Sequence, residues 1–383
     1  MTIVLFDTPE ARQSLYPLSL TKPICDLRLG IFTLREKWQK LTGLTVQTLT
    51  EDYLNEPGLD TDEYLYIQSN ILPTKELVAE LIALKENDGT EFENRLVAFK
   101  TKKKFQYPLQ TNILVEFSPF TVHHSPFTIH FPWHFFQQNE AAIKADFEWI
   151  LQNDKSQAIH SSNQIFGNQL FVQENVDMKA CIINTETGPV FIGKNAQVME
   201  GTIIRGPVAI GEGAVVKMGA KLYGGTTIGP FCTAGGEIKN SMLMAYSNKA
   251  HDGYLGDAVV GEWCNFGAGT TNSNVKNTAG TVKMWNQTEQ KLTEVGLKAG
   301  LVMGDYSRAA INTSFNTGTT VGVCCNVFGS GYPAKNIPLF SWGNEKYSFE
   351  KAIVDIGRWM AFKKKTMTEK EKKILQHLYE KLK

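Results

Sequence analysis

The chain has 383 residues, enough for two domains, and its 39 basic and 39 acidic residues give a formal net charge of zero. This balance argues against nucleic acid or an anionic membrane as the main partner and favours small-molecule substrates. No apolar run approaches the roughly 18 residues of a membrane span, and the first strand-like run reaches Asp7 too early for a signal peptide, so we expect a cytoplasmic protein. The six cysteines lack a C-x-x-C spacing, which predicts reduced core thiols rather than a zinc site or disulfides.

Residues 1–155 alternate strand-like and helix-like segments, which predicts an α/β domain. The expected strands are Ile3–Phe6, Tyr64–Gln68 and Leu96–Phe99. The expected helices are Phe32–Leu41, Lys75–Glu86 and a third that opens at Pro132-Trp133. A linker should then lead into the second domain.

The central stretch carries a six-residue repeat. Every sixth residue from Ile192 to Ile228 is aliphatic, and a second register four places later holds small residues from Ala196 to Cys232. Neither the helical period of 3.6 nor strand alternation produces such a rule. It is typical of a parallel β-helix whose coils take about 18 residues each, with the aliphatic residues inside. We therefore predict a left-handed parallel β-helix over residues 156–340.

The repeat is interrupted twice. The register breaks between Asn240 and Gly256, and again from Asn272 to Gly296, where a projecting hairpin is predicted. Insertions in solenoids leave one edge as loops that commonly bind ligands, so we expect the chemistry at these breaks.

Residues 341–383 are predicted to be helical. Ser348–Phe362 has an apolar face, and Thr368 with Glu371 forms a capping box that opens a final helix. We expect these helices to cover the open end of the rod, where a bare strand edge would invite aggregation.

The first break contains His251 in a polar setting. A lone histidine is more often structural, but Glu237 and Lys239 precede this one and Tyr254 follows it. A base, a carboxylate that orients it and a cation are the groups needed to move an acyl group onto the amine of a phosphorylated sugar. His251 would take the amine proton, Glu237 would hold the imidazole, and a backbone N–H beside Ala268 would support the oxyanion.

These residues carry a resemblance to a known family. Glu237-Ile-Lys239, His251-x-x-Tyr254-Leu-Gly-Asp257 and Asn265-Phe-Gly-Ala-Gly-Thr270 resemble the acetyltransferase half of the bifunctional N-acetylglucosamine-1-phosphate uridyltransferase/glucosamine-1-phosphate acetyltransferases. Pro17-Leu-Ser-Leu-Thr-Lys-Pro23 resembles a form of that enzyme with a shortened N-terminal nucleotidyltransferase domain.

The resemblance implies roles for individual residues. His251 is the general base and Glu237 orients it, while Lys239 binds the sugar phosphate. The residues that hold the sugar are Tyr254, Asn265 and Asn274. It also implies acetyl-CoA as co-substrate and a homotrimer in which neighbouring solenoids share each site.

The sequence departs from the family in both halves. Val275 follows Asn274 where a tyrosine is usual, and Lys221 takes the place of a phosphate-binding arginine. The glycine-rich nucleotide loop is replaced by a segment from Phe6 to Arg12 without glycine, and Asn70 stands where the family has a metal-binding aspartate.

Four charged residues in the region where a nucleotide would sit are candidates to compensate: Arg12, Lys22, Asp26 and Arg28. Magnesium is expected only if this domain is active.

Three functions remain open from the sequence. The first is an acetyl-CoA-dependent N-acetyltransferase that acts on an amino-sugar phosphate in cell-envelope biosynthesis. The second is a fully bifunctional enzyme that also makes the UDP-sugar, and the third is a non-catalytic scaffold that binds sugar nucleotides. The identities of the sugar, the nucleotide and the acyl chain are not predicted.

Overall fold

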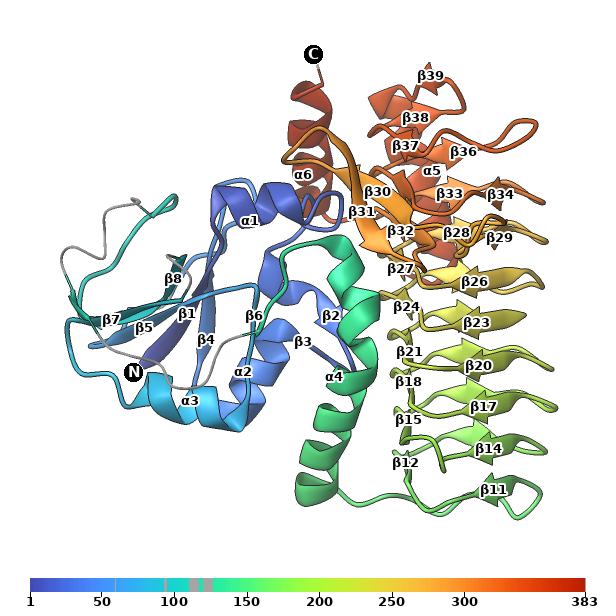
Figure 1. The fold of residues 1–383 in the computed structure, drawn as a ribbon, viewed down its shortest axis with the longest axis horizontal. Helices are drawn as coiled ribbons and strands as arrows, with labels where there is room; N and C mark the ends of the chain where they lie inside the picture. Colours follow the sequence, from blue (N-terminus) through green and yellow to red (C-terminus); the bar gives the residue numbers. More distant parts are fainter. Residues whose placement is uncertain (59, 93–94, 110–116, 120–126, 383) are drawn as a thin grey trace. The chain divides into compact units, whose positions relative to one another are not determined.

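The computed structural model describes residues 1–58, 60–92, 95–109, 117–119 and 127–382. Contacts divide the chain into two compact units (Figure 1). Unit 1 consists of Met1–Leu15, Ser19–Arg28 and Phe32–Phe131, and unit 2 of Tyr16–Leu18, Leu29–Ile31 and Pro132–Lys383. Helix α4 (Pro132–Asn153) has its contacts in unit 2, although the predicted domain boundary lies after it, at residue 155.

Unit 1 is built on a mixed sheet, whose strands among the described residues follow the order β4-β1-β5-β8-β7-β9. The central strand β1 runs parallel to β4 and β5, whereas β8 is antiparallel to both β5 and β7. The strands of unit 1 include the predicted ones: β1 (Thr2–Phe6), β4 (Val46–Leu49), β5 (Tyr64–Gln68), β6 (Ile71–Leu72), β7 (Asp88–Phe92), β8 (Arg95–Thr101), β9 (Ser118–Pro119) and β10 (Phe127–Thr128). Short strands β2 (Arg28–Leu29) and β3 (Phe32–Thr33) lie where the chain passes between the units.

The helices of unit 1 are α1 (Pro9–Ser14), the 3-10 turn η1 (Ile24–Asp26), α2 (Leu34–Thr42) and α3 (Lys75–Ile82). Helix α2 begins two residues later than predicted because Thr33 caps it, with Glu36 closing a reciprocal capping box. Helix α3 ends at Ile82 rather than Glu86, since the chain turns after Ala83 to enter β7.

Unit 2 contains a parallel β-helix with three faces, which confirms the predicted fold (Figure 1). Face 1 comprises β11 (Gln164–Phe166), β14 (Ile182–Asn184), β17 (Ile203–Arg205), β20 (Lys221–Tyr223), β23 (Glu237–Lys239) and β26 (Tyr254–Gly256). Face 2 comprises β12 (Leu170–Val172), β15 (Val190–Ile192), β18 (Val208–Ile210), β21 (Thr226–Ile228), β24 (Met242–Leu243), β27 (Val259–Val260), β32 (Leu301–Met303), β35 (Thr319–Val321) and β37 (Asn336–Ile337). Face 3 comprises β13 (Asp177–Met178), β16 (Gln197–Val198), β19 (Val215–Val216), β22 (Thr233–Ala234), β25 (Asn248–Lys249), β28 (Asn265–Phe266), β33 (Arg308–Ala309), β36 (Asn326–Val327), β38 (Ser341–Trp342) and β39 (Glu345–Lys346). Strands β29 (Thr271–Asn272) and β34 (Ser314–Phe315) form a further parallel pair in the upper coils.

The interior of the β-helix follows the six-residue repeat. The aliphatic residues from Ile192 to Ile228 are almost completely buried and form one continuous cluster. Successive coils are 18 residues apart where the repeat is regular, as for Val190 opposite Val208. Helix α4 packs along face 2, where the buried Asn139 side chain donates to Thr227 Oγ1 at 3.0 Å. The described cysteines are all buried and free, as predicted.

The first predicted interruption, between Asn240 and Gly256, is not an insertion. Strands β24, β25 and β26 lie within it and continue all three faces in register. The coil is only shorter: Thr227 lies opposite Met242, 15 residues on, and Glu237 opposite Tyr254, 17 residues on. The period of six is lost because the corners of this coil contain fewer residues than those of the regular coils. His251 therefore lies in a tight turn and not in a projecting loop.

The second interruption does contain a hairpin, as predicted. Strands β30 (Val282–Asn286) and β31 (Lys291–Gly296) pair antiparallel. The register then resumes at Met303 and runs to Val327, and both residues are buried.

Two C-terminal helices follow, α5 (Phe349–Phe362) with Ser348 as its cap and α6 (Glu369–Glu380) with the predicted Thr368–Glu371 capping box. They do not close the end of the rod. Instead α5 runs along its side, since Trp359 lies over Arg308 of face 3 and Lys363 Nζ donates to the carbonyl of Phe231 at 2.6 Å. The last strands of face 3, β38 and β39, turn back on each other as an antiparallel pair.

Aromatic residues stack on successive coils at the corner between faces 2 and 3. The rings of Phe231 and Tyr246 are 5.1 Å apart, and those of Tyr246 and Trp263 are 4.3 Å apart and nearly parallel. All three residues have positive φ, which is the backbone conformation of this corner. Of the helices within the described ranges, none is long and apolar enough to cross a membrane.

Candidate active site

Face 1 carries three of the predicted substrate-binding residues, Lys221, Lys239 and Tyr254, in two outward rows. Lys221, Glu237 and Tyr254 are register partners on β20, β23 and β26, and Tyr223 and Lys239 form the row beside them. Neighbouring strands are about 4.8 Å apart, so these side chains form one continuous polar surface. Their inward neighbours, such as Leu222 and Ile238, are buried in the core and fix the direction of each side chain.

The carboxylate of Glu237 is held by a residue that the sequence did not point out. Tyr223 donates its hydroxyl hydrogen to Glu237 Oε1 at 2.6 Å. Burial and this carboxylate raise the pKa of the Tyr223 hydroxyl above its usual value. Lys239 Nζ lies 5.5 Å from the centre of the Tyr223 ring, close enough for a cation–π contact. Tyr223 therefore positions both charged residues of this surface.

A second cluster surrounds Asp257, which is buried and has a positive φ. Its carboxylate accepts hydrogen bonds from Asn240 Nδ2 at 2.6 Å and from Asn274 Nδ2. The same amide of Asn274 donates to the Tyr254 hydroxyl at 3.2 Å. Burial and the Asp257 charge raise the pKa of Tyr254 to about 12. The structure thus brings Tyr254 and Asn274 together, with Asp257 and Asn240 as residues that hold them.

His251 lies in the corner from face 3 to face 1, between β25 and β26. Its side chain is exposed, and no hydrogen bond or ion pair to its ring occurs among the residues that the structure describes. The predicted contact with Glu237 is therefore not formed within the chain, because Glu237 is bonded to Tyr223 instead. The imidazole is available to a substrate.

Ala268 lies in the same corner one coil further on. The two turns are joined by a hydrogen bond from Gly269 N to the carbonyl of Asp252 at 3.1 Å. Ala268 is exposed, and within the described parts of the chain its N–H donates no hydrogen bond. Asn265 precedes this corner on the outward side of face 3. A free N–H one coil from an exposed imidazole is the pairing expected of an oxyanion donor and a general base.

A lysine inside the β-helix supports the His251 corner. Lys249 is only 2% exposed and lies opposite Ala234, in an inward position that other coils fill with apolar residues. Its Nζ donates to the carbonyl of Gly235 at 3.1 Å and to the carbonyl of His251. Burial lowers the pKa of Lys249 to about 8. The six-residue repeat does not predict a charged residue at this inward position.

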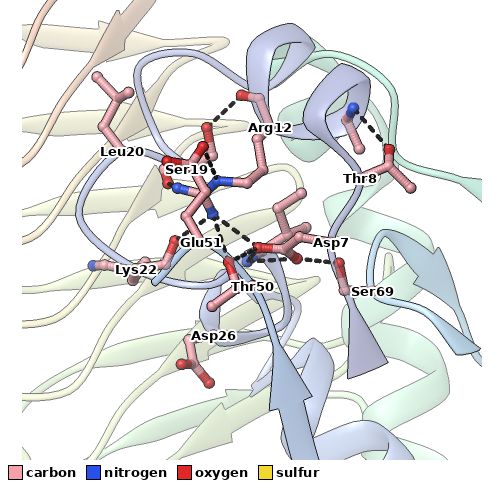
Figure 2. A network of polar contacts seen from close by, with 12 residues as sticks. Asp7, Thr8, Arg12, Ser19, Leu20, Lys22, Asp26, Thr50, Glu51 and Ser69 are labelled. Atoms are coloured by element: carbon pink, nitrogen blue, oxygen red, sulfur yellow. Dashed lines mark hydrogen bonds and ion pairs between the residues drawn. The ribbon is translucent and has the colours of Figure 1, made fainter. Parts of the chain in front are cut away.

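Three of the four candidate nucleotide-binding residues of unit 1, namely Arg12, Asp26 and Arg28, have side chains engaged within the protein. Arg12 is buried, and its guanidinium donates to Asp7 Oδ2 at 2.8 Å, to Thr50 Oγ1 at 3.2 Å and to Glu51 Oε1 at 3.2 Å (Figure 2). It also donates to the carbonyls of Ser19 and, at 3.4 Å, Lys22. The Arg12 guanidinium therefore faces the interior of unit 1, and its contact with a nucleotide stays a prediction.

Two of the other candidates, Asp26 and Arg28, are paired as well. Asp26 accepts two hydrogen bonds from Arg35, at 2.6 and 2.9 Å, and Arg28 lies 3.6 Å from a carboxylate oxygen of Glu36. Asp26 and Arg28 are thus used locally around the start of α2.

A magnesium ion does not fit the described residues of unit 1. Asn70 is buried and its amide donates to the carbonyl of Ile129 at 3.1 Å. The carboxylate of Asp7, at the end of β1, already pairs with Arg12 and accepts hydrogen bonds from the hydroxyls of Thr50 and Ser69. No group of three His, Cys, Asp or Glu side chains that could hold a metal occurs in the described portion of the chain.

Fold and site together define a parallel β-helix with an exposed histidine corner, joined to an α/β unit. Residues 3–155 match a family model described as sugar nucleotidyl transferase. The chain is 32% identical over 199 residues to a bifunctional sugar-1-phosphate nucleotidylyltransferase/acetyltransferase of Sulfurisphaera tokodaii, covering 51% of this chain and 43% of that protein. It is 36% identical over 89 residues to the bifunctional protein GlmU of Methanocaldococcus jannaschii, covering 23% and 21%.

A third relative is the bifunctional protein GlmU of Gloeobacter violaceus, 50% identical over 48 residues that cover 12% of this chain and 10% of that protein. These matches confirm the resemblance found in the sequence. The chain spans less than half the length of the curated relatives it matches.

Proposed function

We propose that the β-helix catalyses transfer of an acetyl group from acetyl-CoA to the amine of an amino-sugar phosphate of the glucosamine 1-phosphate type. The observation that carries this proposal is the exposed His251 imidazole one coil below the free N–H of Ala268. The relative from Sulfurisphaera tokodaii, whose name includes acetyltransferase, supports it. The product would serve nucleotide-sugar synthesis in the cytoplasm.

In this reaction the amine nitrogen attacks the thioester carbonyl carbon, and a new C–N bond forms. His251 takes the proton that the amine loses, and the N–H of Ala268 donates to the developing oxyanion. The C–S bond then breaks, and coenzyme A leaves as a thiol with a proton returned by the imidazolium. Lys221 and Lys239 offer point charges for the sugar phosphate.

The remaining polar groups would bind the sugar. Tyr254 and Asn274 form one preorganised hydrogen-bonding unit on face 1, whereas Asn265 lies on face 3. Because the His251 corner separates these faces, one substrate would contact both only around that corner. A homotrimer in which a neighbouring solenoid completes each site accords with this division, and sedimentation would test it.

The experiment measures thiol release from acetyl-CoA with glucosamine 1-phosphate as acceptor. We expect His251→Ala to lose about 10²- to 10⁴-fold in rate with fold and assembly intact, because a positioned general base contributes that much. His160→Ala, which changes another exposed histidine, should keep full activity. Wild-type protein that releases no thiol with this acceptor or with UDP-linked amino sugars would exclude the proposal and favour the scaffold.

Nucleotidyl transfer by unit 1 is not part of the proposed activity, because its described residues do not fit a magnesium site. Pyrophosphate release from UTP and N-acetylglucosamine 1-phosphate in the presence of magnesium would show a fully bifunctional enzyme instead.

A further inference from the structure

An open pocket lies on face 3 beside helix α5, away from the His251 corner. Its volume is about 580 Å³, within the range of small-molecule sites. The pocket is lined by Arg308, Asn326, Trp342, Asp355, Arg358, Trp359, Ala361 and Phe362. Arg308, Asn326 and Trp342 are register partners on β33, β36 and β38, so they form one outward row.

Arg308 is a buried cation that forms no ion pair among the described residues. Its side chain is only 6% exposed, yet Nε and Nη2 have no hydrogen-bond acceptor in the described structure. The Trp359 ring lies 5.6 Å from the guanidinium carbon, but a ring contacts the flat face of the group and leaves the N–H groups at its edge unsatisfied. Burial lowers the pKa of Arg308, and an arginine nevertheless stays charged at neutral pH.

The carboxylate in the pocket is used by other residues. Asp355 accepts a hydrogen bond from the Tyr347 hydroxyl at 2.6 Å and pairs with Arg358 at 3.1 Å. Two guanidinium groups therefore share a pocket with a single, already paired carboxylate. Lys351, on the same helix, adds a third cation, with Nζ 3.5 Å from the centre of the Trp342 ring. The pocket is electropositive.

Aromatic side chains provide the walls. Trp342 and Trp359 are half-buried, whereas Phe362 is 81% exposed although it lines the pocket. Aromatic surfaces beside cations bind planar ring systems by stacking. A buried arginine without hydrogen-bond acceptors lowers the stability of the fold. A bound anion would supply the missing acceptors.

We propose that this pocket binds a phosphate attached to a planar ring, of the nucleoside monophosphate class, with Arg308 as the anion-binding group and Trp359 and Phe362 as stacking surfaces. Arginine suits this role because its planar N–H fork matches two phosphate oxygens at once. The site is separate from the acetyl-transfer site and does not depend on that activity.

Calorimetry with the full chain and adenosine 5′-monophosphate tests the proposal. We expect the nucleotide to bind, and adenosine or inorganic phosphate alone to bind at least about 10-fold more weakly, because each lacks one of the two contacts. Arg308→Met should weaken nucleotide binding by about 10- to 100-fold, the effect of losing a charged hydrogen bond. Arg205→Met, which removes an exposed arginine from face 1, should leave it unchanged.

The stability of the same variants gives a second measurement. Arg308→Met should raise the melting temperature, because it removes an unpaired buried charge. Should that variant fail to fold, Trp359→Leu must weaken nucleotide binding instead. The proposal is overturned if the wild type does not bind the nucleotide, if Arg308→Met binds as tightly as the wild type, or if His251→Ala rather than Arg308→Met abolishes binding.

Discussion

Replacement of Lys249 by methionine tests whether a charge really lies inside the β-helix. The pKa of Lys249 is lowered from 10.5 to about 8 by burial, a difference that corresponds to about 3 kcal/mol of unfolding free energy. Below pH 8 both the folded and the unfolded chain hold the proton, so the full penalty is present. Between pH 8 and 10.5 the unfolded chain binds more protons than the folded one, and stability rises with pH.

The difference in unfolding free energy between wild type and Lys249→Met should therefore depend on pH. From pH 7 to pH 10 the wild type should gain about 2–3 kcal/mol relative to the variant, whose methionine cannot titrate. Urea unfolding of both proteins at one protein concentration measures this, and other titrating groups cancel in the comparison. Lys217→Met, which changes a lysine two coils away with a partly exposed side chain, is the matched control and should show no such trend. A difference that stays constant from pH 7 to pH 10 would refute a desolvated ammonium at this position.

Three further changes probe other parts of the chain. Gly253→Ala should lower the unfolding free energy by about 1–3 kcal/mol, because the glycine has φ +126° and a Cβ would meet a backbone carbonyl of the next coil. Denaturant unfolding measures this loss, and an unchanged unfolding free energy would contradict the close approach. Asp7→Ala leaves the buried Arg12 without its main partner and should lower the unfolding free energy of unit 1, measured by thermal unfolding, by about 3–5 kcal/mol. A loss of less than about 1 kcal/mol would show that water replaces Asp7 as the partner of Arg12. Trp263→Ala removes a ring that is 8% exposed and should lower the unfolding free energy by about 3–5 kcal/mol. In the control Leu297→Ala, the wild-type side chain is 64% exposed, and the loss should be less than about 0.5 kcal/mol. Equal losses for the two variants in thermal unfolding would exclude a stabilising aromatic stack.

The repeat could be predicted because the β-helix interior accepts only side chains of particular size at fixed intervals. From Ile192 to Ile228 this rule is obeyed without exception, so the sequence alone indicated the architecture. Where the coil shortens to 15 and 17 residues, the interval changes although the stacking does not. The sequence pattern therefore looked like an insertion, and the conformation of the His251 corner was predicted wrongly.

The parts of the site that escaped prediction depend on contacts between coils. Tyr223 donates a hydrogen bond to Glu237 from the preceding coil, and no sequence motif predicts that contact. Lys249 is charged, and charged residues are rarely buried, so its inward position follows only from the carbonyl groups that meet it. In unit 1 the Asp7 carboxylate meets Thr50 and Ser69 from distant strands. Residues with reactive side chains could therefore be named from the sequence. The residues that position those side chains could not.

The register of the three faces means that each coil of the rod touches little beyond its two neighbours. Folding free energy in such a rod adds up from nearest-neighbour terms, so a disturbance decays over one or two coils. Coils around Ile204 can therefore change in sequence without altering the turn that carries His251. Gly235 cannot, because a Cβ there would meet the backbone carbonyl of Ala250 beside this turn. Amide hydrogen exchange should show the same grading, with slow exchange in the middle of the rod and faster exchange towards the β11 end.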